Sequence, residues 1–203
     1  MKSFLYTLLL ILSSIGLFAQ EGFELSLSAG PGQAYTIINN DSSKNATSFQ
    51  LSLQAGLLLN EKFEVFGGLQ YWSSGFNTSI QDETGMVLNT SNYYTIGIPI
   101  GARYYITDNF YGAVRIIPSL QYFAKGSGDT SEAFFYEFNN GSMNDFHLFG
   151  EINIGYEIHL SDNIDIDFEP RLMHSISPIF NAENVNGNLF EYGINVRIQY
   201  NLW

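Results

Sequence analysis

The charged side chains within the alternating segments of this chain occupy polar positions of the alternation. Its four arginines occupy polar sites in segments where apolar and polar residues alternate, and its four lysines lie outside those segments. Carboxylates occupy the same kind of site. The predicted group is Arg103, Arg115, Glu151, Glu157, Asp165, Asp167, Glu169, Arg171, Glu191 and Arg197. Because a buried charge is costly unless it is paired, this pattern predicts an ion-pair network inside a closed structure.

The chemistry of such a network depends on how tightly it fills its interior. The lumen of an eight-stranded barrel is just wide enough for its own side chains to fill it. We therefore expect a structural plug of ion pairs. The alternative is a gated path for protons or ions through the same residues.

The three histidines do not predict a shared site. His147 and His159 fall near opposite ends of one alternating segment, and His174 falls on the apolar side of another. Because they do not converge, we expect no metal site, and no pattern indicates a cofactor.

His174 also lies beside two serines, which raises the possibility of an enzyme. Outer-membrane lipid A deacylases use His, Ser and an acid on their lipid-facing surface, with His and Ser two residues apart on one strand face. Here position 176 is Ile, and Ser175 and Ser177 are both on the other face from His174. Glu183 follows as a candidate acid, but because neither serine shares the face of His174 we expect no catalytic residues.

Eight alternating segments would position these side chains. The last is the clearest, because every even position from Phe190 to Leu202 is apolar. A period of two indicates a β-strand with one apolar and one polar face, and 9–11 tilted residues suffice to cross a bilayer. The eight predicted strands cover about 23–31, 49–59, 63–75, 93–106, 110–123, 145–160, 164–176 and 189–203.

The connections alternate between short and long. Short turns fall near residues 61, 108 and 162, and longer polar stretches include 39–46, 77–92 and 125–144. This layout predicts an all-β fold: an eight-stranded antiparallel up-and-down transmembrane β-barrel with short periplasmic turns and long extracellular loops. Five prolines lie in or near the strands and predict β-bulges or positions beyond the hydrocarbon layer, because each removes a ladder donor.

Composition favours a membrane barrel over a soluble one. Only 14% of residues are charged, against about 25% in soluble domains. A soluble lipocalin-like barrel would carry lysines along its outer face, and this chain has none on its strands. The net charge of −12 argues against nucleic acid as a partner.

The N-terminus has the pattern of an export signal. Lys2 precedes an apolar run from Phe4 to Phe18, which is short for a membrane helix of ~20 residues, and Ala19 is a suitable cleavage residue, so a cleaved signal is favoured over a retained anchor. We expect residues 1–19 to be a signal peptide, residues 20–203 to be the barrel domain, and the cell outer membrane to be its location.

Together these residues resemble a known family. The segments IGIPIGARYYIT and GAVRIIPSLQYF, the leader ending in Phe-Ala-Gln and the alternating last strand are similar to small outer-membrane β-barrels of the Bacteroidota, the PorT-like group. The resemblance implies contact with outer-membrane lipids, insertion by barrel-insertion machinery and a link to secretion. The family's terminal insertion signal maps to Ile198, Tyr200, Leu202 and Trp203, although here the terminal aromatic Trp203 falls on the inward parity.

One loop carries a candidate interaction motif. Residues 125–144 are mostly polar but contain the aromatic run Phe134, Phe135, Tyr136 and Phe138. This run either extends the flanking strands or forms an exposed apolar patch for a protein partner outside the cell. We expect a structural or interaction role, with a small porin-like channel as the alternative and a lipid-modifying enzyme as the third class.

Overall fold

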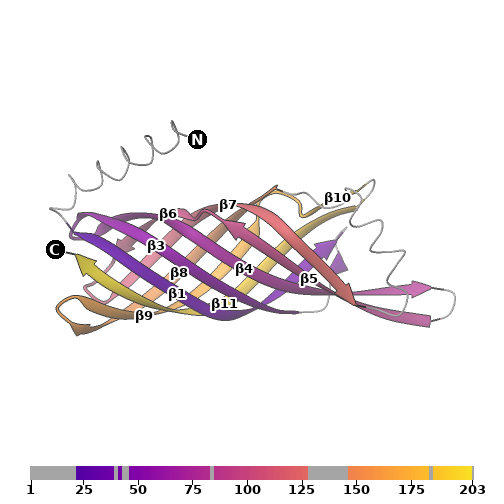
Figure 1. Ribbon diagram of the computed structural model, residues 1–203, viewed down its shortest axis with the longest axis horizontal. Coiled ribbons are helices and arrows are strands. Elements are labelled where there is room, and N and C mark those ends of the chain that lie inside the picture. The colour runs from indigo at the N-terminus through magenta and orange to yellow at the C-terminus, as the bar shows by residue number, and fades with distance from the viewer. Residues whose placement is uncertain are drawn as a thin grey trace.

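The structure is a computed structural model that describes residues 22–38, 41–42, 46–82, 85–127, 146–182 and 185–202. These residues form one antiparallel sheet that closes on itself (Figure 1). The longer strands are β1 (Phe23–Ile38), β3 (Ala46–Asn60), β4 (Phe63–Asp82), β5 (Gly85–Gly97), β6 (Ile100–Tyr105), β7 (Phe110–Ser127), β8 (Phe146–Ser161), β9 (Ile164–Ser175) and β11 (Val185–Leu202). Two short strands, β2 (Asp41–Ser42) and β10 (Phe180–Ala182), extend the sheet at one end of the barrel.

Eight strands form the wall, because β5 and β6 together make a single one. Both pair with β4 on one side and with β7 on the other. The ring closes where β1 pairs with β11, from Phe23 opposite Leu202 to Ile38 opposite Gly187. The prediction of an eight-stranded antiparallel barrel is confirmed. Within the described residues, no helix is long and apolar enough to cross a membrane.

Both described chain ends lie at the end of the barrel that carries the short turns (Figure 1). The prediction of a polar loop at 77–92 was wrong. In this region β4 and β5 continue as a hairpin whose ladder extends to the pair Asp82 and Gly85. This hairpin projects beyond the other strands (Figure 1). A hairpin that extends past the barrel wall has no lipid-facing side that must be apolar, so its sequence need not alternate.

Exposure alternates along the wall strands, with apolar side chains outside and polar ones inside. Ile100, Val114 and Leu160 are 60%, 59% and 59% exposed, whereas Gln50 and Arg197 are fully buried. This is the reverse of a soluble barrel, in which the apolar face turns inward. The outer surface therefore suits a solvent of hydrocarbon.

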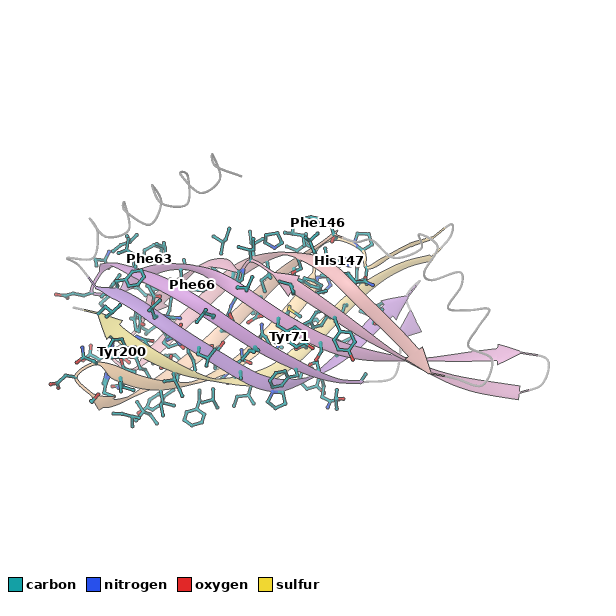
Figure 2. All side chains as sticks on the ribbon, viewed as in Figure 1. Phe63, Phe66, Tyr71, Phe146, His147 and Tyr200 are labelled. Carbon is teal, nitrogen blue, oxygen red and sulfur yellow. The ribbon has the colours of Figure 1, made fainter. Side chains whose placement is uncertain are left out.

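Aromatic side chains lie toward both ends of this outer surface. Phe63 and Tyr200 lie near the turn end, and Tyr71 and Phe146 lie toward the loop end (Figure 2). Phe66 and His147 belong to the interior, where both are buried. Two belts of rings at opposite ends match the positions of the two bilayer interfaces.

The prolines interrupt the ladders without shifting them. Pro31, Pro118 and Pro170 each pair with one neighbouring strand and are absent from the ladder on the other side. Pro99 lies in the break between β5 and β6, and each interrupted ladder resumes in its original register. Of the two alternatives expected at the prolines, β-bulges are therefore wrong for these four, because the missing N–H creates a local gap rather than an inserted residue. Pro178 lies outside the strands.

Candidate functional site

The lumen is the candidate site. Its side chains form layers, and the one nearest the turn end, called the lower layer, joins the first strand β1 to the last strand β11. Glu24 on β1 lies between two arginines: its Oε1 is 2.9 Å from Arg197 Nη1 and 3.4 Å from Arg103 Nη1. Arg103 also forms an ion pair with Glu64 on β4, and Arg197 forms one with Asp167 on β9. These five residues come from five wall strands, so the layer cross-links most of the ring.

Tyr111 is the aromatic centre of this layer. It is fully buried and its hydroxyl donates to Glu169 Oε1 at 2.6 Å. The guanidinium carbons of Arg103 and Arg197 lie 4.8 Å and 5.4 Å from the centre of its ring. An arginine close to an aromatic face gains a cation–π attraction that strengthens when water is excluded.

The middle layer combines ion pairs with amide hydrogen bonds. Arg115 Nε lies 3.3 Å from Glu151 Oε1. Gln50 Nε2 donates to Glu151 Oε2 at 3.1 Å, and Gln50 Oε1 accepts from Asn195 Nδ2 at 2.8 Å. Asn195 Oδ1 in turn accepts from Arg171 Nε at 3.1 Å. The layer forms one chain of contacts across the barrel from β7 to β9.

On the loop-end side of the middle layer, Glu191 is the last charged residue before an apolar cluster. Its carboxylate receives the Arg171 guanidinium on one oxygen and the indole N–H of Trp72 on the other. Both partners are buried, and this group lies next to an apolar cluster. That cluster fills the loop end of the described lumen and consists of Ala34, Trp72, Ile117, Phe149, Met173, Ile179 and Leu189.

The described lumen holds more carboxylates than arginines. Eight are buried: Glu24, Glu64, Glu151, Glu157, Asp165, Asp167, Glu169 and Glu191. Four arginines face them, so the formal charge of these twelve groups is −4 (4 − 8). Among these eight buried carboxylates, Glu157 and Asp165 are the two that no arginine contacts within ion-pair distance.

All ten charged residues of the predicted group are buried in the lumen, but the group was incomplete. Glu24 and Glu64 are missing from it, although both occupy polar positions in alternating segments. Their positions could have identified them. Phe66 and Trp72 also occupy polar positions, and they face inward as buried filling rather than outward.

Among the described residues, His174 and the two neighbouring serines each contact other groups rather than one another. Ser175 Oγ accepts a hydrogen bond from the backbone N–H of Leu189 at 2.8 Å, and Ser177 Oγ accepts one from that of Leu148 at 2.8 Å. His174 is exposed on the outer face and stacks edge-on against Phe190. Glu183 lies outside the described residues.

Several other predicted sites also lie outside the described residues: the signal segment 1–19, the aromatic run Phe134, Phe135, Tyr136 and Phe138, and Trp203. The remaining residues of the predicted terminal signal are placed on β11. Ile198, Tyr200 and Leu202 are 51%, 47% and 41% exposed on the outer face.

A family model agrees with this geometry. The model for the outer membrane protein beta-barrel domain matches residues 5–197. The chain belongs to this family. It is therefore an outer-membrane protein, and the apolar outer face of its barrel contacts membrane lipids. In this class the short turns face the periplasm and the loops face outside, so the turn end of the barrel is its periplasmic end.

Solved structures of small outer-membrane proteins are similar in fold. OprG from Pseudomonas aeruginosa has a TM-score of 0.50 at 10% identity, over 89% of this chain and 96% of that one. Neisserial surface protein A has a TM-score of 0.47 at 16% identity, over 86% and 96%. Ail, the attachment invasion locus protein of Yersinia pestis, has a TM-score of 0.41 at 14% identity, over 86% and 97%. No curated protein sequence matches the chain.

Proposed function

We propose that this protein is a non-catalytic outer-membrane barrel that is closed to solutes and acts as a structural or interaction platform. The observation that carries the proposal is that side chains of the described residues fill the lumen. Layers of paired arginines and carboxylates lie beneath an apolar cluster that includes Trp72, Ile117 and Phe149. A continuous aqueous path would require that packing to open.

The hydrogen bonds of Ser175 and Ser177 support the proposal that the protein has no enzyme activity. Both hydroxyl oxygens near His174 already accept backbone hydrogen bonds, and Ser175 is fully buried. A nucleophile needs a base within hydrogen-bond reach and access to its substrate. Unchanged lipid A mass spectra on overexpression are the expected result, and a new or missing acyl chain would contradict the proposal.

Single-channel recording in planar bilayers tests the closed lumen directly. We expect at most small, rare openings from the wild-type protein. The matched control is Trp72→Ala combined with Phe149→Ala, which removes the two largest rings of the apolar cluster and should raise conductance in the same assay. A steady large conductance from the wild type would replace this proposal with a porin-like channel.

The interaction role rests on what the barrel presents outside the cell. Within the described residues, the β4–β5 hairpin extends beyond the other strands (Figure 1). The sequence resemblance to PorT-like barrels of the Bacteroidota supports an anchor for a secretion assembly as the partner class, and the run at 134–138 is the proposed contact.

A pull-down from outer membranes tests the interaction role, with an affinity tag inserted in an extracellular loop. The test compares the full chain with a variant lacking 126–144. We expect a partner that is captured by the full chain and lost with the deletion. Identical capture by both forms would remove the 134–138 segment from the proposal.

A further inference from the structure

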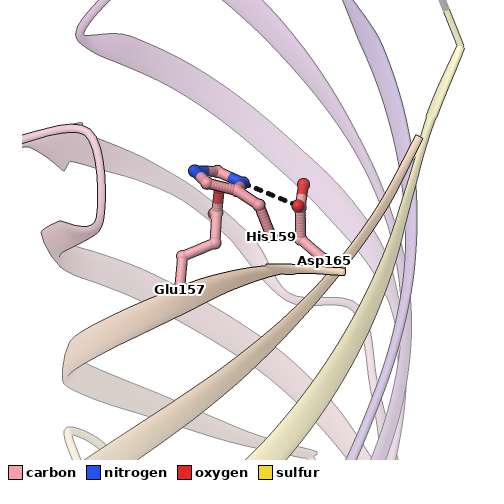
Figure 3. Close-up of side chains that lie close together, drawn as sticks. All are labelled: Glu157, His159 and Asp165. Carbon is pink, nitrogen blue, oxygen red and sulfur yellow. Dashed lines mark hydrogen bonds and ion pairs between the residues drawn. The ribbon is translucent and has the colours of Figure 1, made fainter. Parts of the chain in front are cut away.

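Three side chains with metal-binding chemistry meet at the periplasmic mouth of the barrel (Figure 3). Glu157 and His159 lie two residues apart on β8, and Asp165 lies directly opposite His159 on β9. His159 Nδ1 is 2.7 Å from Asp165 Oδ1 and 3.5 Å from Glu157 Oε1. One candidate ligand atom from each residue lies within 4.8 Å of the others.

These separations suit a common ion. Nitrogen and oxygen ligands lie about 2.0–2.2 Å from zinc, which places neighbouring ligands roughly 3–3.5 Å apart in a tetrahedral site. Small side-chain movements would bring the three atoms into that range. The tight turn at Ser161–Asn163 joins β8 to β9 here, and although the ladder shifts register between His159 and Ser161, His159 still lies opposite Asp165.

Glu157 supplies a separate observation that points to a ligand. Its side chain is buried, with 5% of the residue exposed, and its Oε2 has no hydrogen-bond partner among the described residues. No arginine forms an ion pair with it or with Asp165. A buried carboxylate oxygen without a partner carries a large desolvation cost, which a bound cation would remove.

The second carboxylate is already held in position. Asn201 Nδ2 donates to Asp165 Oδ2 at 2.6 Å, and Asn201 Oδ1 accepts from Gln199 Nε2 at 3.0 Å. This leaves Asp165 Oδ1 directed toward His159. Hydrogen bonds that orient a ligating carboxylate are a regular part of metal sites.

The surroundings favour a cation and allow it to enter. The three residues line a cavity of about 660 Å³, together with Glu24, Glu61, Asp108 and Asp162. His159 is the only basic residue among those lining it, and its side chain is 53% exposed. A cleft lined by charges of one sign raises the local concentration of the opposite ion.

We propose that Glu157, His159 and Asp165 bind a divalent transition-metal ion, with Zn²⁺ as the representative case. Water from the cavity would complete the coordination. The imidazole ligand favours zinc and similar ions over Mg²⁺ and Ca²⁺, which prefer sites made entirely of oxygen. The three histidines do not converge, but this site needs only His159 together with two carboxylates.

A zinc titration of the refolded, tag-free protein in detergent micelles tests the proposal by competition with a chromogenic chelator. We expect one Zn²⁺ per chain, with affinity at least tenfold lower in His159→Gln, Glu157→Gln and Asp165→Asn. The matched control is His174→Gln, which removes an exposed imidazole from the outer face and should leave the affinity unchanged. Equal affinity in His159→Gln and the wild type, or no zinc binding by the wild type, would overturn the proposal.

NMR of the wild-type histidine rings keeps the test independent of whether a variant folds. One equivalent of Zn²⁺ should shift the His159 ring signals and leave those of His174 in place, and excess Mg²⁺ should not reverse the shift. An unchanged His159 signal at saturating zinc would refute the site.

Discussion

Tyr111 and Gly155 face each other across the β7–β8 ladder, and the tyrosine ring occupies the space beside the glycine. A Cβ atom built on Gly155 would lie 1.9 Å from Tyr111 Cζ. Any larger residue at this position must therefore displace the ring that packs between Arg103 and Arg197. The absence of a side chain at Gly155 is what lets the lower layer assemble.

We predict that Gly155→Ala destabilises the barrel by about 1–3 kcal/mol, the usual cost of overpacking a filled interior. The measurement is the free energy of unfolding in urea from lipid vesicles. Gly112→Ala is the matched control, because its added Cβ would meet its nearest atom only at 4.0 Å. If both variants lost the same stability, the close approach of Tyr111 would not be the cause.

We predict that Arg197→Gln destabilises the barrel by about 3–5 kcal/mol, the range for removing one partner from a buried ion pair. Arg197 contacts Glu24, Asp167 and Glu169, so its loss leaves three buried carboxylates short of a partner. The same urea titration measures the effect. Lys62→Gln at the exposed turn removes an equal charge and should leave stability unchanged; an equally small loss in Arg197→Gln would contradict the network.

We predict that a lysine on the outer face is costly only at mid-depth. Val114 faces outward between Ala102 and Ile152, whereas Leu160 lies at the periplasmic turn. Val114→Lys should cost about 2–4 kcal/mol and Leu160→Lys about 0–1 kcal/mol, because the hydrocarbon penalty falls toward the interface. Folding equilibria into vesicles compare the two, and equal costs would mean that these positions do not differ in depth.

We predict that Trp72 is shielded from water-soluble quenchers. The chain has two tryptophans, so Trp203→Phe leaves Trp72 as the only one. Trp72 is 2% exposed beneath the loop end of the lumen, and iodide should quench its fluorescence far less than that of free tryptophan. Strong quenching in folded protein would indicate that water reaches the apolar cluster at the loop end of the lumen.

Most of the wall could be predicted from sequence, because period-two alternation is a direct consequence of a strand between lipid and a polar interior. The pattern found β3, β8, β9 and β11 to within a few residues. It failed between Asn77 and Asn92, where the β4–β5 hairpin leaves the barrel and neither face must be apolar. It also could not distinguish a bulge from an in-register gap at Pro31, because both remove the same hydrogen bond.

The lumen was predicted in composition but not in pairing. The alternation predicts which side chains face the lumen. It does not predict which residues of neighbouring strands lie at the same level along the barrel axis. The Glu24–Arg197 contact depends on the stagger between β1 and β11, where the backbone of Glu24 lies opposite Asn201. The meeting of Glu157, His159 and Asp165 likewise depends on a register set by one turn.

The closure between β1 and β11 also constrains the order of events in assembly. Glu24 and Arg197 are 173 residues apart, so Arg197 is synthesised long after the strand that holds Glu24. Contacts this distant in sequence slow folding, since chain entropy is lost before they form. A partly inserted sheet would hold Glu24 without Arg197, and its open edges would lack backbone partners in lipid. The ion pair between Glu24 and Arg197 therefore forms only when β1 and β11 meet.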